Sequence, residues 1–219
     1  MMAPPLRYFQ LLVLVEFYQP KTIVEVGTWN GHHGIDMCRS ALGSHSESVS
    51  YTGYDLYQEG SDDLDELEFN AKSRVTLEDV SESFDELKAE FPNRFSYELI
   101  KGDTNKTLME TQADFVFLDG GHSPKTVWND YEKTKDSKII VFDDYFKEDK
   151  HKKIPHVNHC GTNVVVDSIK EKAKWILPSL DLVAGGGITS LAVIVNEGRT
   201  PPNKDLLLIP VFIEQPKPN

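Results

Sequence analysis

The chain has 219 residues, which suits one domain, and its apolar fraction of 39% is enough for a sizeable core. Its 35 acidic and 23 basic residues give a net charge of −12, which argues against nucleic acid as a partner because phosphate binding needs basic side chains. The apolar run LLVLV is too short for a signal core or a membrane span, and Cys38 and Cys160 make no disulfide framework. We therefore expect a cytoplasmic protein with a small-molecule substrate and no membrane partner.

Strand and helix patterns alternate along the chain and predict an α/β fold, doubly wound, with a mainly parallel seven-stranded sheet and helices on both faces. The whole chain, 1–219, is expected to form one domain, with an N-terminal helix within 1–20, a helical insertion or connection at 57–92 and a C-terminal tail at 198–219. The predicted strands are 22–27, 48–56, 95–103, 113–119, 138–144, 181–186 and 190–197. The predicted helices are 6–18, one after the turn at 28–31, the acidic segment 57–91, 124–133 and 162–177.

The segment EVGTWNGHHG follows the first predicted strand and carries Gly27, Gly31 and Gly34. Glycines there allow a sharp turn and a close approach to a ligand at a helix N-terminus, although they also serve simply to pack a helix on a sheet. Asp55 ends the second strand, where nucleotide-binding folds place an acid for the ribose hydroxyls. Because the pattern is ExGxxxG rather than GxGxxG, a pyrophosphate fits poorly, and Glu25 suits a ligand with positive charge.

Three aspartates end two further strands: Asp119 closes ADFVFLD, and Asp143 with Asp144 closes KIIVFDD. If these strands are neighbours, their backbones lie about 5 Å apart and the carboxylates repel one another unless a hard cation lies among them. The competing interpretation is that the Asp pair caps a helix or begins a turn, where aspartate is also favoured.

The order of these motifs resembles the class I S-adenosylmethionine-dependent methyltransferases, and implies their Rossmann-like methyltransferase fold over about residues 22–197. By that resemblance the glycine turn holds the methionine end of S-adenosyl-L-methionine, Asp55 binds the ribose and Asp103 lies near the adenine. The residues assigned to the cofactor are Glu25, Gly27, Thr28, Gly31, Asp55, Asp103 and Asp119.

Within that class, DGGH at 119–122 together with DDY at 143–145 resembles methyltransferase family 24 and the macrocin-type metal-dependent O-methyltransferases. This resemblance implies Asp119, Asp143 and Asp144 as ligands of Mg²⁺, with Mn²⁺ or Ca²⁺ as alternatives. His122 and Asp119 become the catalytic residues, and His122 is either the general base or an orienting hydrogen-bond partner. The implied reaction is O-methylation of a hydroxyl on a small molecule, such as a sugar or a glycosylated metabolite.

Other interpretations stay open at this point. An NAD(P)-dependent oxidoreductase would use the same turn and Asp55, and a non-catalytic nucleotide-binding module would keep the fold without chemistry. The loop 151–160 carries His and Cys donors, but their spacing matches no strong zinc pattern and favours a substrate pocket or lid. A homo-oligomer is compatible with the sequence.

Overall fold

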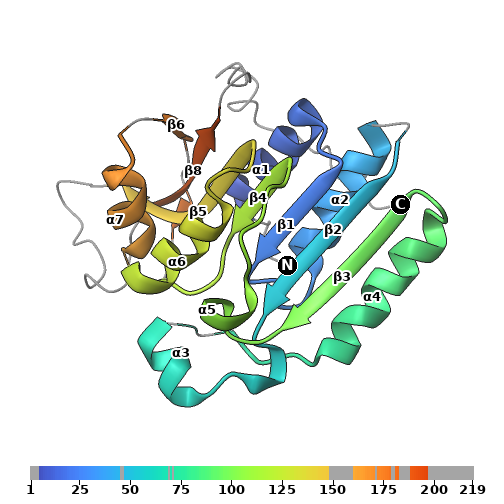
Figure 1. The fold of residues 1–219 in the computed structure, drawn as a ribbon, viewed down its shortest axis with the longest axis horizontal. Helices are drawn as coiled ribbons and strands as arrows, with labels where there is room; N and C mark the ends of the chain where they lie inside the picture. Colours follow the sequence, from blue (N-terminus) through green and yellow to red (C-terminus); the bar gives the residue numbers. More distant parts are fainter. Residues whose placement is uncertain are drawn as a thin grey trace, which may run out of the picture.

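An open, twisted sheet with helices on both faces forms the frame of the protein in the computed structural model (Figure 1). The structure describes residues 5–44, 47–68, 70, 72–147, 160–170, 172–178, 181–182 and 188–196. The strands are β1 (Thr22–Val26), β2 (Val49–Asp55), β3 (Phe95–Lys101), β4 (Phe115–Leu118), β5 (Ile139–Lys147), β6 (Ala173–Ile176), β7 (Asp181–Leu182) and β8 (Ile188–Val195). The helices are α1 (Leu6–Tyr18), α2 (His32–Ser44), the 3-10 helix η1 (Tyr57–Glu59), α3 (Asp62–Glu68), α4 (Leu77–Glu90), α5 (Thr104–Thr107), α6 (Pro124–Thr134) and α7 (Gly161–Ser168).

The sheet has the strand order β3-β2-β1-β4-β5-β8-β6, and the short β7 also pairs with β8. Strands β1 to β5 are mutually parallel, whereas β8 runs antiparallel between β5 and β6. From β1 to β3 the sheet grows on one side of β1, and after β3 the chain crosses over to form β4 on the other side of β1. The carboxyl ends of β1 and β4 therefore lie next to each other at the point where ligands bind in such sheets. The predicted doubly wound, mainly parallel sheet of seven strands is confirmed, with β7 as a two-residue addition.

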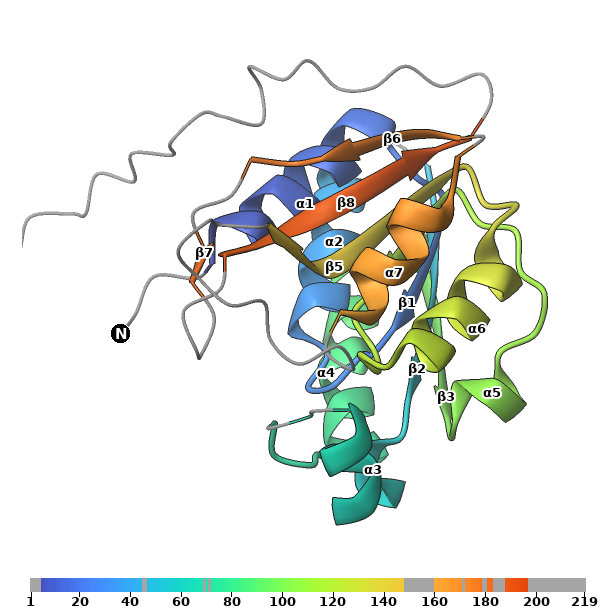
Figure 2. The ribbon, with the colours of Figure 1, turned by 90° about the vertical axis from the view of Figure 1, so that its left-hand side faces the viewer.

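Two apolar cores lie on the two faces of this sheet, as Figure 2 shows with α1, α2 and α4 on one side and α6 and α7 on the other. The first core contains Leu14 of α1, Met37 of α2 and Phe84 of α4. The second contains Tyr131 of α6 and Val165 of α7. Burial on both faces explains why β4 and the first half of β5 are continuous apolar runs rather than alternating ones.

The prediction of one helix over 162–177 was wrong in its second half. Helix α7 ends at Ser168, and Ala173–Ile176 forms β6, which pairs antiparallel with β8 from Ala173 opposite Val195 to Ile176 opposite Ala192. Backbone pairing with the free edge of β8 outweighs the helical propensity of this lysine-rich stretch. Of the strand predicted at 181–186, Asp181–Leu182 forms β7, and the remainder lies outside the described residues, as do the loop 151–159 and the tail 198–219.

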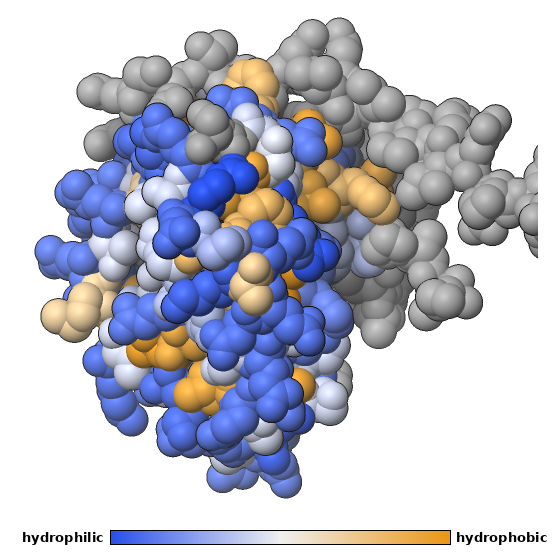
Figure 3. All heavy atoms as spheres, turned by 90° about the vertical axis from the view of Figure 1, so that its right-hand side faces the viewer, coloured by the Kyte–Doolittle hydropathy of each residue, from blue (hydrophilic) through white to orange (hydrophobic). Residues whose placement is uncertain are grey.

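The surface agrees with the acidic composition. Figure 3 shows the face on the side of β3 and α4, where hydrophilic side chains dominate and apolar patches are small. In the part of the chain that the structure describes, none of the helices has the length and apolar character needed to cross a membrane.

Candidate active site

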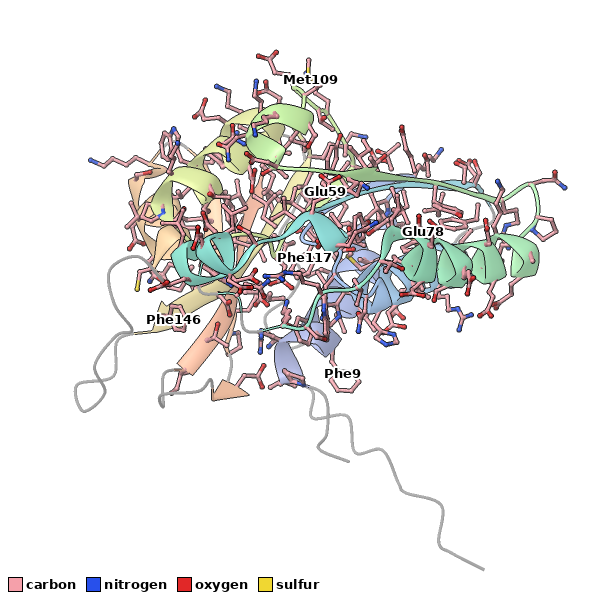
Figure 4. The ribbon with its side chains drawn as sticks, turned by 90° about the horizontal axis from the view of Figure 1, so that it is seen from below. Phe9, Glu59, Glu78, Met109, Phe117 and Phe146 are labelled. Carbon is pink, nitrogen blue, oxygen red and sulfur yellow. The ribbon has the colours of Figure 1, made fainter. Side chains whose placement is uncertain are left out.

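A cavity of about 600 Å³ opens at the carboxyl ends of the parallel strands. Its walls come from the ends of β1, β2 and β3, from α3 and the segment that follows it, and from the loop 119–126 after β4. Figure 4 looks onto this edge of the sheet, with Glu59 of η1 and Phe117 of β4 near the middle of the view and Glu78 of α4 to one side. Concave sites at this position in doubly wound sheets bind small ligands.

Gly27 ends β1 at the floor of the cavity and has a φ of 91°. A Cβ atom at this position would overlap the backbone carbonyl of Asp119. Glycine is therefore required both for the left-handed turn and for the close approach of the β4 end, whose Asp119 amide donates to the Val26 carbonyl oxygen at 2.8 Å.

Four of the predicted cofactor residues line the cavity: Gly27, Asp55, Asp103 and Asp119. The carboxylate of Asp55 is held by two backbone amides, since Trp29 N donates to one oxygen at 2.7 Å and Tyr57 N to the other at 2.8 Å. Asp103 caps the short helix α5 by accepting from the amide of the residue two positions further on. The acid that ends β2 and the acid two residues after β3 thus both line the cavity and are both held by backbone amides.

The structure places the other three, Glu25, Thr28 and Gly31, away from the described lining of the cavity. Glu25 is fully buried beneath α2, accepts a hydrogen bond from the hydroxyl of Tyr51, and has its pKa raised well above the usual range by that burial. Thr28 is 3% exposed, and Gly31, with a φ of 81°, faces Phe84 of α4. A direct contact between these three and a ligand in the cavity stays a prediction.

The three predicted metal ligands come together. One carboxylate oxygen each of Asp119, Asp143 and Asp144 lies within 4.8 Å of the others. Adjacent residues of a regular strand point to opposite faces, but β5 has a register shift against β8 between Phe142 and Tyr145, and Asp144 has a φ of 54°. This irregularity turns both carboxylates of the pair toward Asp119.

A small void of about 10 Å³ adjoins the cluster and is lined by Asp119, His122, Asp143 and Asp144 among others. That volume is close to the room that a single water molecule or ion needs. The buried Oδ2 of Asp119 has no hydrogen-bond partner among the described residues. Within the described part of the chain this oxygen accepts no hydrogen bond and is paired only with the ammonium of Lys72 at 3.5 Å, so together with the two further carboxylates beside the void it offers a donor set that fits a hard divalent cation.

Two cationic side chains that the sequence did not single out also reach the cluster. Arg7 of α1 donates from Nε to Asp143 Oδ1 at 2.7 Å, and Tyr8 donates to the other oxygen of Asp143 at 3.1 Å. Burial alone would lower the pKa of Arg7, but the neighbouring Asp143 carboxylate raises it above its usual value, so this guanidinium stays charged. Lys72, after α3, places Nζ 3.5 Å from Asp119 Oδ2. Arg7 and Lys72 lie far from the strand-end motifs in sequence, so no local pattern marks them.

His122 lies on the cavity wall and retains 24% side-chain exposure. Its Nδ1 is 3.4 Å from Asp144 Oδ2. A carboxylate facing Nδ1 favours the proton on that nitrogen, which leaves the lone pair on Nε2. The structure thus places the predicted base beside the predicted metal ligands.

A family model described as a methyltransferase domain, family 24, matches residues 24–145. Among solved structures, the O-methyltransferase TomG from Streptomyces achromogenes, in complex with SAM, is 14% identical with a TM-score of 0.56, covering 89% of this chain and 81% of TomG. An O-methyltransferase from Bacillus cereus in complex with SAH is 15% identical with a TM-score of 0.55, covering 90% of this chain and 83% of that one. The SAH-bound methyltransferase PaMTH1 from Podospora anserina is 16% identical with a TM-score of 0.53, covering 89% and 79%. No curated protein matches the sequence.

Proposed function

Because this chain belongs to methyltransferase family 24, we propose that it transfers the methyl group of S-adenosylmethionine to a hydroxyl group of a small molecule. The observation that carries the proposal is that Asp119 both lines the ligand-sized cavity and belongs to the carboxylate cluster. The solved structures of similar fold that were determined with SAM or SAH include two O-methyltransferases, which supports the same cofactor here.

In this proposal the cofactor occupies the cavity at the ends of β1, β2 and β3. Asp55 is suited to the ribose because a carboxylate has about four acceptor positions and two backbone amides use only two of them. Asp103, which also lines the cavity, is proposed to lie near the adenine. Gly27 leaves the floor free of side-chain atoms, so the methionine end can lie against the backbone.

The residues that would hold a metal ion are Asp119, Asp143 and Asp144, with Mg²⁺ favoured by an all-oxygen donor set and Mn²⁺ or Ca²⁺ as alternatives. A divalent cation bound there supplies polarisation that makes the acceptor hydroxyl easier to deprotonate. Arg7 and Tyr8 each donate to one oxygen of Asp143, so this carboxylate is already held in one orientation and loses less conformational entropy when a cation binds.

His122 is proposed as the group that takes the proton of the acceptor hydroxyl. With Nδ1 facing Asp144, its Nε2 is the available base, and the exposed part of the ring allows a substrate oxygen to approach. Asp144 would then stabilise the charged imidazole after proton transfer. Direct transfer requires the hydroxyl oxygen, the methyl group and the sulfonium to be in line, and it needs no covalent enzyme intermediate.

The acceptor is proposed to be a hydroxylated small molecule, with sugars and glycosylated metabolites as the first compounds to test, following the resemblance of the DGGH and DDY motifs to macrocin-type enzymes. The experiment is titration calorimetry with SAH and, separately, with NADH, followed by a screen for methyl transfer from labelled SAM to such acceptors with Mg²⁺ or with a chelator. Binding of SAH but not NADH, and transfer that the chelator abolishes, supports the proposal. NADH binding would favour an oxidoreductase, and SAH binding without transfer across the screen would favour a non-catalytic module.

A further inference from the structure

Helix α3 lies below the carboxyl edge of the sheet and projects from the body of the protein (Figures 1 and 2). All residues of this helix are described, and none of them is buried. Leu64 and Leu67 are 38% and 53% exposed, yet both line the cavity. A helix with so little packing needs another attachment to keep its place over the cavity.

Arg74, in the segment after α3, donates to Asp62 and Asp65 of the helix, both at 2.6 Å. The attachment of α3 to the loop after β4 is the side chain of Glu68, its last residue. Its carboxylate accepts hydrogen bonds from the backbone amide and from the hydroxyl of Ser123, both at 2.7 Å, and from the hydroxyl of Thr126 at 2.7 Å. Ser123 is the N-cap of α6, an eleven-residue helix whose N-terminus attracts negative charge. Charge-assisted bonds of this kind are about twice as strong as neutral ones.

Gly121, the second glycine of DGGH, is what allows Glu68 to reach this place. A Cβ atom on Gly121 would lie 2.6 Å from Glu68 Oε2 and 2.8 Å from Thr126 Cγ2. Gly120 is needed for a different contact, since a Cβ atom there would lie 2.9 Å from the side chain of Val26. In the DGGH motif, the first glycine therefore allows close packing on β1 and the second leaves room for Glu68 of α3.

The residue that Glu68 holds directly follows His122. The loop from Asp119 to Ser123 is fixed at its start by the bond between the Asp119 amide and the Val26 carbonyl oxygen, and near its end by the Gly161 amide, which donates to the His122 carbonyl oxygen at 3.0 Å. Glu68 is the contact that joins this loop to the helix over the cavity.

We propose that Glu68 is a positioning residue: by joining α3 to Ser123, it couples closure of α3 over a ligand in the cavity to the alignment of His122. The link itself rests on the described contacts, and its consequence for the reaction rests on the proposed function. Leu64 and Leu67 then form the apolar cover over the bound ligand when α3 is in place.

The test uses Glu68→Ala and Glu68→Gln in the full-length protein, with Glu66→Ala as the matched control, because Glu66 is an exposed acid on the same short helix. Exchange of the Ser123 amide hydrogen is measured by NMR, without turnover. We expect it to quicken at least tenfold in Glu68→Ala, to a smaller extent in Glu68→Gln, whose amide oxygen still accepts, and not at all in Glu66→Ala.

Kinetics then separate positioning from stability. We expect kcat to fall ten- to a hundredfold in Glu68→Ala with a much smaller change in KM for the acceptor, the melting temperature staying close to that of Glu66→Ala, and Glu68→Gln recovering part of kcat. Ser123 exchange equal to wild type in both Glu68 variants would overturn the link. Faster exchange with an unchanged kcat would overturn the positioning role. If Glu68→Ala fails to fold, Glu68→Gln tests both the link between Glu68 and Ser123 and the positioning role. Absence of SAH binding in the wild type would count against the proposed function, and the exchange of the Ser123 amide would still test the link.

Discussion

Replacing Asp143 by alanine should destabilise the protein even when no metal is bound. The Asp143 side chain is 2% exposed and the Arg7 side chain 11%, and their 2.7 Å bond is the shortest contact that Arg7 makes with an acid in the described structure. Removing one partner of a buried ion pair costs about 3–5 kcal/mol because the remaining charge stays buried without its partner.

The expected value lies at the lower end of that range. Without Asp143, Arg7 still has two acidic neighbours, Asp181 Oδ2 at 3.5 Å and Asp144 Oδ1 at 3.9 Å. The substitution also removes the repulsion between Asp143 and the neighbouring carboxylates. We expect a decrease of about 3 kcal/mol in the free energy of unfolding, which corresponds to a fall in Tm of roughly 6–12 °C for a chain of this size.

The assay is urea-induced unfolding in the presence of EDTA, so that metal binding does not contribute. Asp63→Ala, an exposed acid on α3, is the control and should change stability by less than about 0.5 kcal/mol. The double variant Arg7→Met/Asp143→Leu should recover most of the loss, because a buried pair can be replaced by apolar side chains at little cost. A loss below about 1 kcal/mol in Asp143→Ala, or no recovery in the double variant, would refute this reasoning.

Three further predictions concern cations and protons in the site. The Lys72→Gln variant lacks a cation that competes for Asp119, so the affinity of this variant for Mn²⁺, measured by calorimetry, should rise about tenfold. The control Lys125→Gln, on the cavity wall, should change the Mn²⁺ affinity much less, and an unchanged affinity in Lys72→Gln would contradict the competition. His122→Ala should lower kcat far more than it changes KM, and a wild-type pH–rate profile in this variant would exclude His122 as the base. Burial lowers the pKa of His33 from 6.5 to about 4, so the unfolded chain binds a proton in this range that the folded chain does not. Stability should therefore fall as the pH drops from 6.5 to 4, by up to about 3 kcal/mol, and His33→Asn should flatten that part of the stability–pH curve; the same slope in both proteins would contradict it.

Most of the fold could be predicted from the sequence because strands β1 to β5 are marked by apolar runs that end in turn residues, and most of the helices between them by helical spacing of apolar residues. Strand β6 could not, since Ala173–Ile176 is a strand only through its pairing with β8. The segment 57–92, predicted as a helical insertion or connection, contains η1, α3 and α4, but nothing in its sequence indicates that Glu68 reaches Ser123. Such contacts join residues that are far apart in the chain and become visible only after folding.

Part of the candidate site could likewise be predicted from the sequence, and part could not. The cluster of Asp119, Asp143 and Asp144 was predictable because Asp119 follows β4 and the pair follows the part of β5 that is hydrogen-bonded to β4, although β5 does not end at Asp144 as predicted but continues to Lys147. The irregularity at Asp144 that brings the pair to one side was not predictable. The position of Glu25 follows from strand geometry: it alternates with Val26, which lines the cavity, and so it points to the α2 face. Arg7 could not be found, because it lies 136 residues from Asp143 on a helix that precedes the sheet.

A crystal structure of the protein with SAH and Mn²⁺, which uses the anomalous signal of manganese, would show the cofactor and the metal at once. We expect SAH in the cavity with its ribose on Asp55 and its sulfur toward His122, and an anomalous peak among Asp119, Asp143 and Asp144. An empty cavity at saturating SAH, or a manganese peak that lies away from the three carboxylates, would contradict this proposal.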